Sequence, residues 1–189
     1  MSVSTYEALL TAVQDEVRSA LAAIAEAEVV ALEDAIDGSP RVFCAARGRS
    51  ELVARGFAMR LMHLGIVAHV VGDTTTPAIG RGDLLLLTSG TATTATLVPI
   101  AERAAAVGAR RATVTANSNG ALALGADPLV RVPAPPSRQD PGTPGAPLLP
   151  MGSRFELAAG LLFEALTIRL MHRRDTTVEA MFGRHANLE

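Results

Sequence analysis

The sequence contains no lysine, and all 17 of its basic residues are arginines. A lysine amine is needed for Schiff-base chemistry, for covalent attachment of pyridoxal phosphate and for the Walker-type phosphate loop. These three kinds of chemistry are therefore excluded. Cysteine is nearly absent too, since Cys44 has no second cysteine with which to pair. The chain cannot form an internal disulfide, which fits a cytoplasmic location.

Blocks of like charge and long apolar runs are also missing. The formal net charge is −2 at neutral pH, so we expect no nucleic-acid partner. The least charged long stretch, between Asp83 and Glu102, is interrupted by threonines, a glycine and a proline. It is therefore interpreted as a strand, a loop and a helix rather than as a membrane span. The first ten residues lack a basic region followed by an apolar run, so no secretory signal is expected.

What the sequence does contain is enough apolar material for one globular domain, with 49% hydrophobic and 19% charged residues in a chain of 189. Apolar residues recur at helical spacing in several segments. The predicted helices span residues 4–37, 48–65, 93–107 and 153–173, with a helical turn at 121–125 and a shorter helix near the C-terminus. In the second of these, the residues expected to face inward are Leu52, Phe57, Leu61 and Leu64.

Five short apolar runs predict strands at residues 41–46, 66–71, 83–89, 111–116 and 127–132. Because these runs alternate with amphipathic helices, they predict an α/β fold in which helices cover both faces of a parallel sheet. A ligand site is then expected where the strands end. No domain boundary stands out, so residues 1–189 are expected to form a single domain with extra helical segments at 1–37 and 151–189. The proline-rich segment 133–150 is predicted to be a loop: a lid, an interface arm or a mobile connection.

Two strand-to-helix junctions carry small and hydroxyl residues. The first reads Gly48-Arg49-Ser50, and the second reads Ser89-Gly90-Thr91-Ala92-Thr93-Thr94. Unpaired amides and a partial positive charge at a helix N-terminus attract phosphate, and hydroxyl groups and an arginine add donors. Simple N-capping by Ser50 or Thr93 would explain either junction without a ligand. Two such junctions at the same end of one sheet favour a bound phosphate.

Glu156 lies at the edge of a very apolar helix. An acid in such surroundings can have a raised pKa and can move a proton to or from carbon. The alternative is a capping box, Ser153-x-x-Glu156, in which the carboxylate only bonds the backbone. The histidines and the cysteine do not have metal-ligand spacing, so no metal and no cofactor are expected.

Several segments together resemble the 6-phospho-3-hexuloisomerases, a family of sugar isomerase (SIS) domain enzymes. In chain order they are "GRSELVARGFAMRLMHLG", "VVGDTTTPAIGRGDLLLLTSG", "PMGSRFE" and "RHANLE". The resemblance implies a three-layer SIS-type fold with a five-stranded parallel sheet. It also implies metal-free conversion of 3-hexulose 6-phosphate to fructose 6-phosphate, a step of the ribulose monophosphate pathway that follows formaldehyde fixation.

The resemblance also implies roles for individual residues. Ser50 would contact the phosphate or the sugar, and the hydroxyl loop would place Ser89, Thr91 and Thr94 at the phosphate. Glu156 matches the proton shuttle suggested for the family. His185 matches a proposed catalytic partner that, in related sugar isomerase domains, can reach the site of a neighbouring subunit. A homo-oligomer, either a dimer or a tetramer, is therefore expected.

Three residues depart from the family pattern. Ala92 stands where the hydroxyl loop usually has a glycine, and Arg47 and Glu51 flank the first junction where the family has small residues. A β-carbon at Ala92 could hinder a turn with positive φ, and Arg47 and Glu51 could pair with each other or change which sugar fits. Two alternative functions therefore stay open: a sugar-phosphate-binding SIS module without turnover, and an isomerase for a different phosphosugar.

Overall fold

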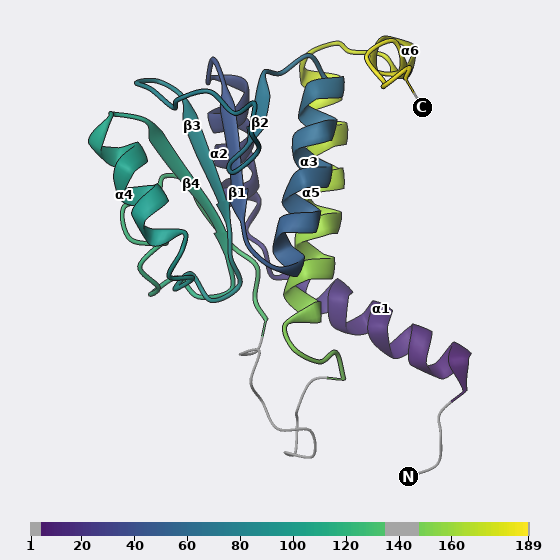
Figure 1. Ribbon diagram of the computed structural model, residues 1–189. Coiled ribbons are helices and arrows are strands. Elements are labelled where there is room, and N and C mark those ends of the chain that lie inside the picture. Colours follow the sequence, from purple (N-terminus) through teal and green to yellow (C-terminus); the bar gives the residue numbers. More distant parts are fainter. Residues whose placement is uncertain (1–4, 135–147, 189) are drawn as a thin grey trace.

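A five-stranded parallel sheet organises the computed structural model, which describes residues 5–134 and 148–188 (Figure 1). The strand order is β2-β1-β3-β4-β5, and every neighbouring pair is parallel. The strands are β1 (Val42–Ala46), β2 (Ala68–Val70), β3 (Leu84–Thr88), β4 (Arg110–Thr115) and β5 (Leu129–Arg131). All five expected strands are therefore present, and the predicted parallel α/β fold is confirmed.

Helices form a layer on each face of the sheet, as Figure 1 shows. The helices are α1 (Tyr6–Ala22), α2 (Glu26–Asp37), α3 (Arg49–His63), α4 (Val98–Ala106), α5 (Ser153–Arg173) and α6 (Val178–Phe182). One core cluster unites α1, α2, α3 and α5 with the sheet, and a second unites α4 with the opposite face. In β3, Leu84 and Leu86 belong to the first cluster, whereas Leu85 and Leu87 belong to the second. This alternation explains the unbroken run of leucines, because a central parallel strand is covered on both sides.

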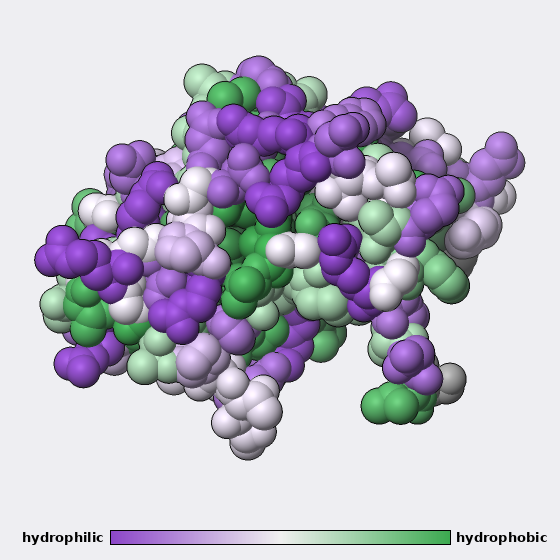
Figure 2. All heavy atoms as spheres, turned by 90° about the horizontal axis from the view of Figure 1, so that it is seen from above, coloured by the Kyte–Doolittle hydropathy of each residue, from purple (hydrophilic) through white to green (hydrophobic). Residues whose placement is uncertain are grey.

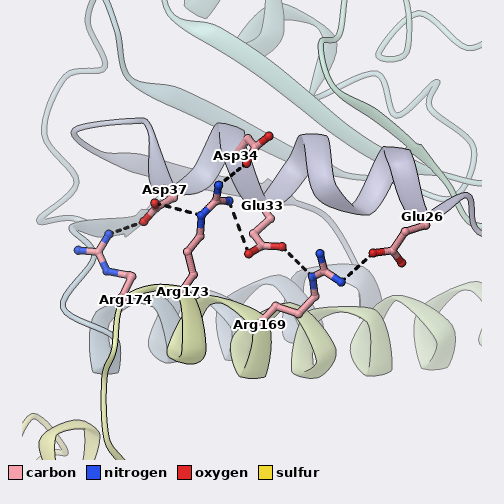
Figure 3. A network of polar contacts seen from close by, with 7 residues as sticks. All are labelled: Glu26, Glu33, Asp34, Asp37, Arg169, Arg173 and Arg174. Atoms are coloured by element: carbon pink, nitrogen blue, oxygen red, sulfur yellow. Dashed lines mark hydrogen bonds and ion pairs between the residues drawn. The ribbon is translucent and has the colours of Figure 1, made fainter.

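The long helix α5 runs the length of the molecule beside α3 (Figure 1). Its buried face includes Phe155, Phe163 and Leu166, and the Phe163 ring stacks on Phe57 of α3 with centroids 4.3 Å apart. The last turns of α5 are tied to α2 by a network of ion pairs (Figure 3). Its members are Glu26, Glu33, Asp34 and Asp37 of α2 with Arg169, Arg173 and Arg174 at the end of α5. Helix α5 is therefore held by packing along α3 and by charge against α2 at its C-terminal end.

Three local predictions were wrong. The helix predicted over residues 4–37 is two helices, which separate where Ala25 takes an extended conformation (φ −73°, ψ 129°). No glycine or proline marks this break, because it reflects tertiary packing: α1 packs on α5, whereas α2 packs on both β5 and α5. The helix predicted from Thr93 begins only at Val98. Leu52 is 71% exposed rather than inward, since the core-facing positions of that turn are Val53 and Ala54.

The proline-rich segment can be compared with its prediction only in part. Residues 133–134 and 148–150 belong to neither a helix nor a strand, as a loop requires. The prediction of a lid, an interface arm or a mobile connection falls on residues 135–147, which lie outside the described residues.

Candidate active site

A pocket of about 820 Å³ opens at the carboxyl ends of the strands. This is the end of a parallel sheet where α/β proteins bind ligands. Its wall is formed by the residues that follow β1, β3 and β4 and by the segment that begins α5. The lining residues are Arg47, Ser50, Thr88, Ser89, Gly90, Thr91, Thr93, Thr94, Ala116, Asn117, Ala134, Met151, Gly152, Phe155 and Glu156. Ser50 of the first junction, the hydroxyl residues of the second junction and Glu156 therefore meet in one cavity, whereas Gly48 and Arg49, also predicted as phosphate-binding residues, are not among the lining residues.

The first junction brings Ser50 to the pocket. Gly48 is the N-cap of α3 and has a positive φ of 64°, a conformation that favours glycine. The helix begins at Arg49, so Ser50 lies inside the first turn and does not cap the helix. Its hydroxyl group lies at the pocket wall instead. N-capping is thus not the reason for the serine at this position.

The second junction forms an irregular loop that is held by hydrogen bonds of its own hydroxyl groups. Ser89 Oγ lies 2.9 Å from Thr94 Oγ1, and Thr91 Oγ1 accepts a bond of 3.3 Å from the Thr93 amide. Because α4 begins at Val98 and its N-cap is Leu97, Thr93 does not cap that helix. This hydroxyl loop, residues 89–94, therefore faces the pocket as a row of donors and acceptors rather than as a helix N-terminus.

The segment after β4 supports the hydroxyl loop from the side. The Ala116 amide donates to the Gly90 carbonyl at 3.2 Å, and Asn117 Nδ2 donates to the Thr91 carbonyl at 3.0 Å. The Thr115 hydroxyl also donates to the Gly90 carbonyl, at 3.3 Å. These bonds fix the backbone of the loop, so its hydroxyl groups hold their positions before any ligand enters.

Ala92 takes up the positive φ that its β-carbon was expected to hinder. It has φ 51° and is fully buried. Its carbonyl accepts a bond of 2.9 Å from the Leu122 amide. The β-carbon fits because Gly120 lies opposite: a β-carbon added at Gly120 would lie 2.5 Å from that of Ala92. The alanine therefore keeps the turn that a glycine would allow, and a glycine elsewhere makes the room for it.

Glu156 lies in the first turn of α5, at the pocket wall, with 13% of its side chain exposed. The capping box does not form, because the N-cap is Gly152 and has no side-chain hydrogen bond. The Ser153 hydroxyl instead accepts a bond of 2.9 Å from Arg49 Nη1, and Arg49 Nε lies 2.8 Å from Glu156 Oε2. This contact is an ion pair without good hydrogen-bond geometry, and Oε2 has no hydrogen-bond partner among the described residues.

Burial raises the pKa of Glu156 above its ordinary value, and the charge of Arg49 only partly offsets this effect. A carboxylate with a raised pKa binds a proton more strongly than an exposed one does, so it is a stronger base once ionised. The position and the environment of Glu156 are thus those of a group that can move a proton within the pocket.

The segment that leads into α5 is held by Glu16 of α1. Its carboxylate accepts bonds from the amides of Leu148 (2.5 Å) and Leu149 (3.3 Å), and it pairs with Arg154 at 3.2 Å. Burial raises the pKa of Glu16, but these donors together outweigh it and hold the pKa below its ordinary value. Met151 and Gly152 follow after Pro150 and line the pocket. One carboxylate outside the pocket therefore fixes part of its wall.

Several lining residues were not predicted as site residues, among them Arg47, Thr88, Asn117 and Phe155. Arg47 was noted only as a departure from the family pattern, and it does not pair with Glu51. Glu51 instead lies 3.1 Å from Arg55. Thr88 could have been found from its place at the end of a buried strand, one residue before the hydroxyl loop. Arg49, which was predicted to bind phosphate, contacts Glu156 and is not among the lining residues.

His185 lies at the opposite end of the molecule. About 25 Å of helix separates Glu156 from the end of α5 at Arg173, and α6 and the C-terminus follow beyond that end (Figure 1). His185 is exposed and stacks on His63 with ring centroids 5.3 Å apart. This end, seen from above in Figure 2, is mostly hydrophilic with hydrophobic patches between. Within one chain the structure does not bring His185 to the pocket.

Residues 5–134 and 148–188 contain no group of three or more His, Cys, Asp or Glu side chains that could hold a metal ion. No helix among them is both long and apolar enough to cross a membrane.

Comparison with known proteins identifies the family. The SIS domain model matches residues 35–145. The chain is 43% identical over 180 residues to the 3-hexulose-6-phosphate isomerase of Mycobacterium gastri, covering 95% of this chain and 89% of the relative. It is 38% identical over 175 residues to the 3-hexulose-6-phosphate isomerase of Bacillus subtilis (strain 168), covering 93% and 94%.

A solved structure agrees with these relatives. The crystal structure of a Methanococcus jannaschii protein, described as inferring a molecular function of 3-hexulose-6-phosphate isomerase, superposes with a TM-score of 0.82 and is 29% identical in sequence. The match covers 95% of this chain and 98% of that one. The fold, the placement of the pocket and the similarity over nearly the whole chain lead to one conclusion. This chain belongs to the family of SIS-domain proteins that includes the 3-hexulose-6-phosphate isomerases.

Proposed function

We propose that this chain is a sugar-phosphate isomerase that interconverts 3-hexulose 6-phosphate and fructose 6-phosphate. The observation that carries the proposal is the position of Glu156, a mostly buried carboxylate with a raised pKa on the wall of a pocket otherwise rich in hydroxyl groups. The relatives that bear this activity in their names cover almost the whole chain, pocket segments included.

The hydroxyl loop is the part of the pocket that suits the phosphate. Ser89, Thr91, Thr93 and Thr94 present hydroxyl groups to the cavity, and Gly90 brings the backbone close to it. Ser50 adds a further hydroxyl from the first turn of α3. Binding the phosphate here fixes the position of the sugar carbons, which is how orientation lowers a barrier.

The reaction moves one proton between two neighbouring carbons. Ionised Glu156 takes the proton from C2 of the 3-ketose, and the electron pair forms an enediolate across C2 and C3. Glu156 then returns the proton to C3 while the hydroxyl proton passes from O2 to O3, so that C2 becomes the carbonyl of fructose 6-phosphate. Base catalysis by one positioned carboxylate accounts for both halves of the step.

His185 acts at the substrate oxygens in this proposal, and it comes from a second copy of the chain. It lies too far from Glu156 in its own chain, because it stacks on His63 at the end of α3 whereas Glu156 pairs with Arg49 at the start of that helix. Its side chain is exposed. The outer sides of α3 and α5 carry exposed apolar residues that a second copy would cover. These residues are Leu52, Met59 and Met62 of α3 with Leu157, Leu161 and Ile168 of α5. A homo-oligomer, either a dimer or a tetramer, follows, and a cytoplasmic location fits the single, buried Cys44.

Incubation with fructose 6-phosphate in D₂O tests the activity directly. An enediolate across C2 and C3 places deuterium at C3 of recovered fructose 6-phosphate. Deuterium at C1 instead would indicate an aldose–ketose isomerase and a different phosphosugar substrate. Thermal stabilisation by fructose 6-phosphate without any exchange would indicate a binding module that does not catalyse turnover. The Glu156→Gln variant is the control: any deuterium that it still incorporates comes from exchange that does not depend on Glu156.

A further inference from the structure

Arg47 supplies a positive charge to the pocket from the end of β1. It is the one basic residue among the described residues that line the cavity. Ala46 pairs in register with Thr88 of β3, so Arg47 leaves the sheet beside Ser89, where the hydroxyl loop starts. We propose that Arg47 neutralises the phosphate of the substrate and so strengthens the preference of this site for phosphorylated sugars. The inference rests on the proposed function, because it names a residue of this chain that adds to the binding of that class of substrate.

The neighbouring arginine is already engaged by other residues. Arg49 Nε lies 2.8 Å from Glu156 Oε2, and Arg49 Nη1 donates to Ser153 Oγ. If Arg49 turned to a phosphate, Glu156 would lose the positive charge that pairs with it. The two arginines therefore have different roles: Arg49 pairs with Glu156, and Arg47 remains available to bind the ligand.

Arg47 has no carboxylate to neutralise it in the described part of the chain. Its Nη1 donates to the carbonyl of Ala46 at 2.8 Å. Glu51, one turn along α3, is instead held by Arg55, which also pairs with Asp73 at 2.9 Å. A half-buried guanidinium without a counter-ion attracts an anion more strongly than the neutral hydroxyls around it do.

The chemistry of the two groups matches. A phosphate dianion accepts two parallel N–H bonds from the planar guanidinium, whereas each hydroxyl of the loop donates only one bond. The two charges of the pocket also come from different walls, since Arg47 follows β1 and Glu156 belongs to α5. A substrate whose phosphate lies between Arg47 and the hydroxyl loop points its carbons away from that anchor and toward Glu156.

Calorimetric binding measurements test the role of Arg47 without any need for turnover. The ligands are inorganic phosphate, fructose 6-phosphate and uncharged fructose, and the variants are Arg47→Gln and Arg47→Lys. Arg18→Gln is the matched control, because Arg18 is a surface arginine of α1 that pairs with Asp15. Loss of a charged hydrogen-bonding partner should weaken binding of the two phosphate-bearing ligands by about tenfold to hundredfold in Arg47→Gln. Arg47→Lys should recover part of that affinity, and fructose should bind all proteins alike.

Steady-state kinetics add a second readout: kcat/KM should fall in Arg47→Gln, mainly through a rise in KM. Unchanged affinity for phosphate and fructose 6-phosphate would overturn the proposal. A loss of kcat at unchanged affinity would overturn it as well, because Arg47 would then act on the reacting carbons. An unmodified protein that binds fructose 6-phosphate in an Arg47-dependent way, yet exchanges no deuterium, would refute the isomerase function and leave the role of Arg47 intact.

Discussion

The Arg49 guanidinium and the Glu156 carboxylate meet at 2.8 Å and join the first turn of α3 to the first turn of α5. The two helices come from distant parts of the chain, and their N-terminal turns form adjoining walls of the pocket. The contact holds the acid at the cavity without supplying a well-formed hydrogen bond. The contact therefore fixes the position of the carboxylate while its pKa stays above the ordinary value. The first two predictions depend on these two properties.

Replacing Glu156 by Gln should lower kcat by about 10²–10⁴, the usual contribution of a positioned general base. The amide keeps the shape of the side chain, so circular dichroism and the melting profile should still report a folded protein. Glu164→Gln is the matched control, since Glu164 lies on the same helix but is exposed and pairs with Arg60. Near-normal turnover in Glu156→Gln would remove this residue from the chemistry.

Removing the charge of Arg49 should shift the pH dependence of catalysis. Glu156 acts as a base only when ionised, so kcat/KM falls as the pH drops through its pKa. Burial already raises this pKa, and Arg49 opposes the rise. In Arg49→Gln the acidic limb of the pH profile should therefore move to higher pH. An acidic limb that stays at the same pH would mean that Arg49 does not influence the pKa of Glu156.

Gly120→Ala should destabilise the protein by about 1–3 kcal/mol, the usual cost of overpacking. The new β-carbon would lie 2.5 Å from the β-carbon of Ala92 and 2.6 Å from its carbonyl oxygen. Adding Ala92→Gly should not restore stability fully, because the carbonyl oxygen remains. Gly56→Ala is the control: Gly56 is exposed on α3 with open space around it, and the change should stabilise by about 0.5–1 kcal/mol. Denaturant titrations measure all four proteins, and full recovery in the double variant would contradict this account.

Glu16→Ala should lower the free energy of unfolding by about 1–3 kcal/mol, because two backbone amides and Arg154 lose their acceptor. Glu16→Gln should lose less, since its amide oxygen can still accept a bond. The pKa of Glu16 is held low in the folded protein, so its stabilising effect is complete above the unfolded pKa and disappears as the pH falls through the folded value. Asp15→Asn, at an exposed neighbour, should change little. Equal stability of Glu16→Ala and the parent protein would show that Glu16 does not hold the segment that leads into α5.

Mixed oligomers should show whether His185 crosses between subunits. Each of the variants Glu156→Gln and His185→Ala should be nearly inactive alone. Co-expression of the two under separate affinity tags should give mixed oligomers that regain activity, because some pockets then receive both intact residues. Oligomers in which both tagged chains carry Glu156→Gln are the control. Purified mixed oligomers that stay inactive would show that His185 does not act in the pocket of a neighbouring subunit.

The strands and the main site segments were predictable because their signals are local. The leucines of β3 are buried on both faces, and a strand that ends in hydroxyl residues places them at the edge where ligands bind. The break near Ala25 was not predictable, because tertiary packing rather than a glycine or proline sets it. The start of α4 at Val98 did carry a local signal that the prediction missed, because Pro99 stands in the first turn of the helix, where proline is favoured. Arg49 was predicted to bind phosphate but pairs with Glu156. This contact was not predictable, because Glu156 belongs to a helix that follows much later in the chain.

The late position of α5 in the chain has a consequence for biosynthesis. All five strands are synthesised before Ser153, yet the larger core cluster needs Phe155, Phe163 and Leu166 to close. A nascent polypeptide that has emerged only to β5 would expose the apolar sides of α1, α2 and α3 that α5 covers in the complete fold, the kind of surface that aggregates or recruits chaperones. Ribosomal pausing or premature termination within that window would therefore harm this protein more than the same event after Arg173.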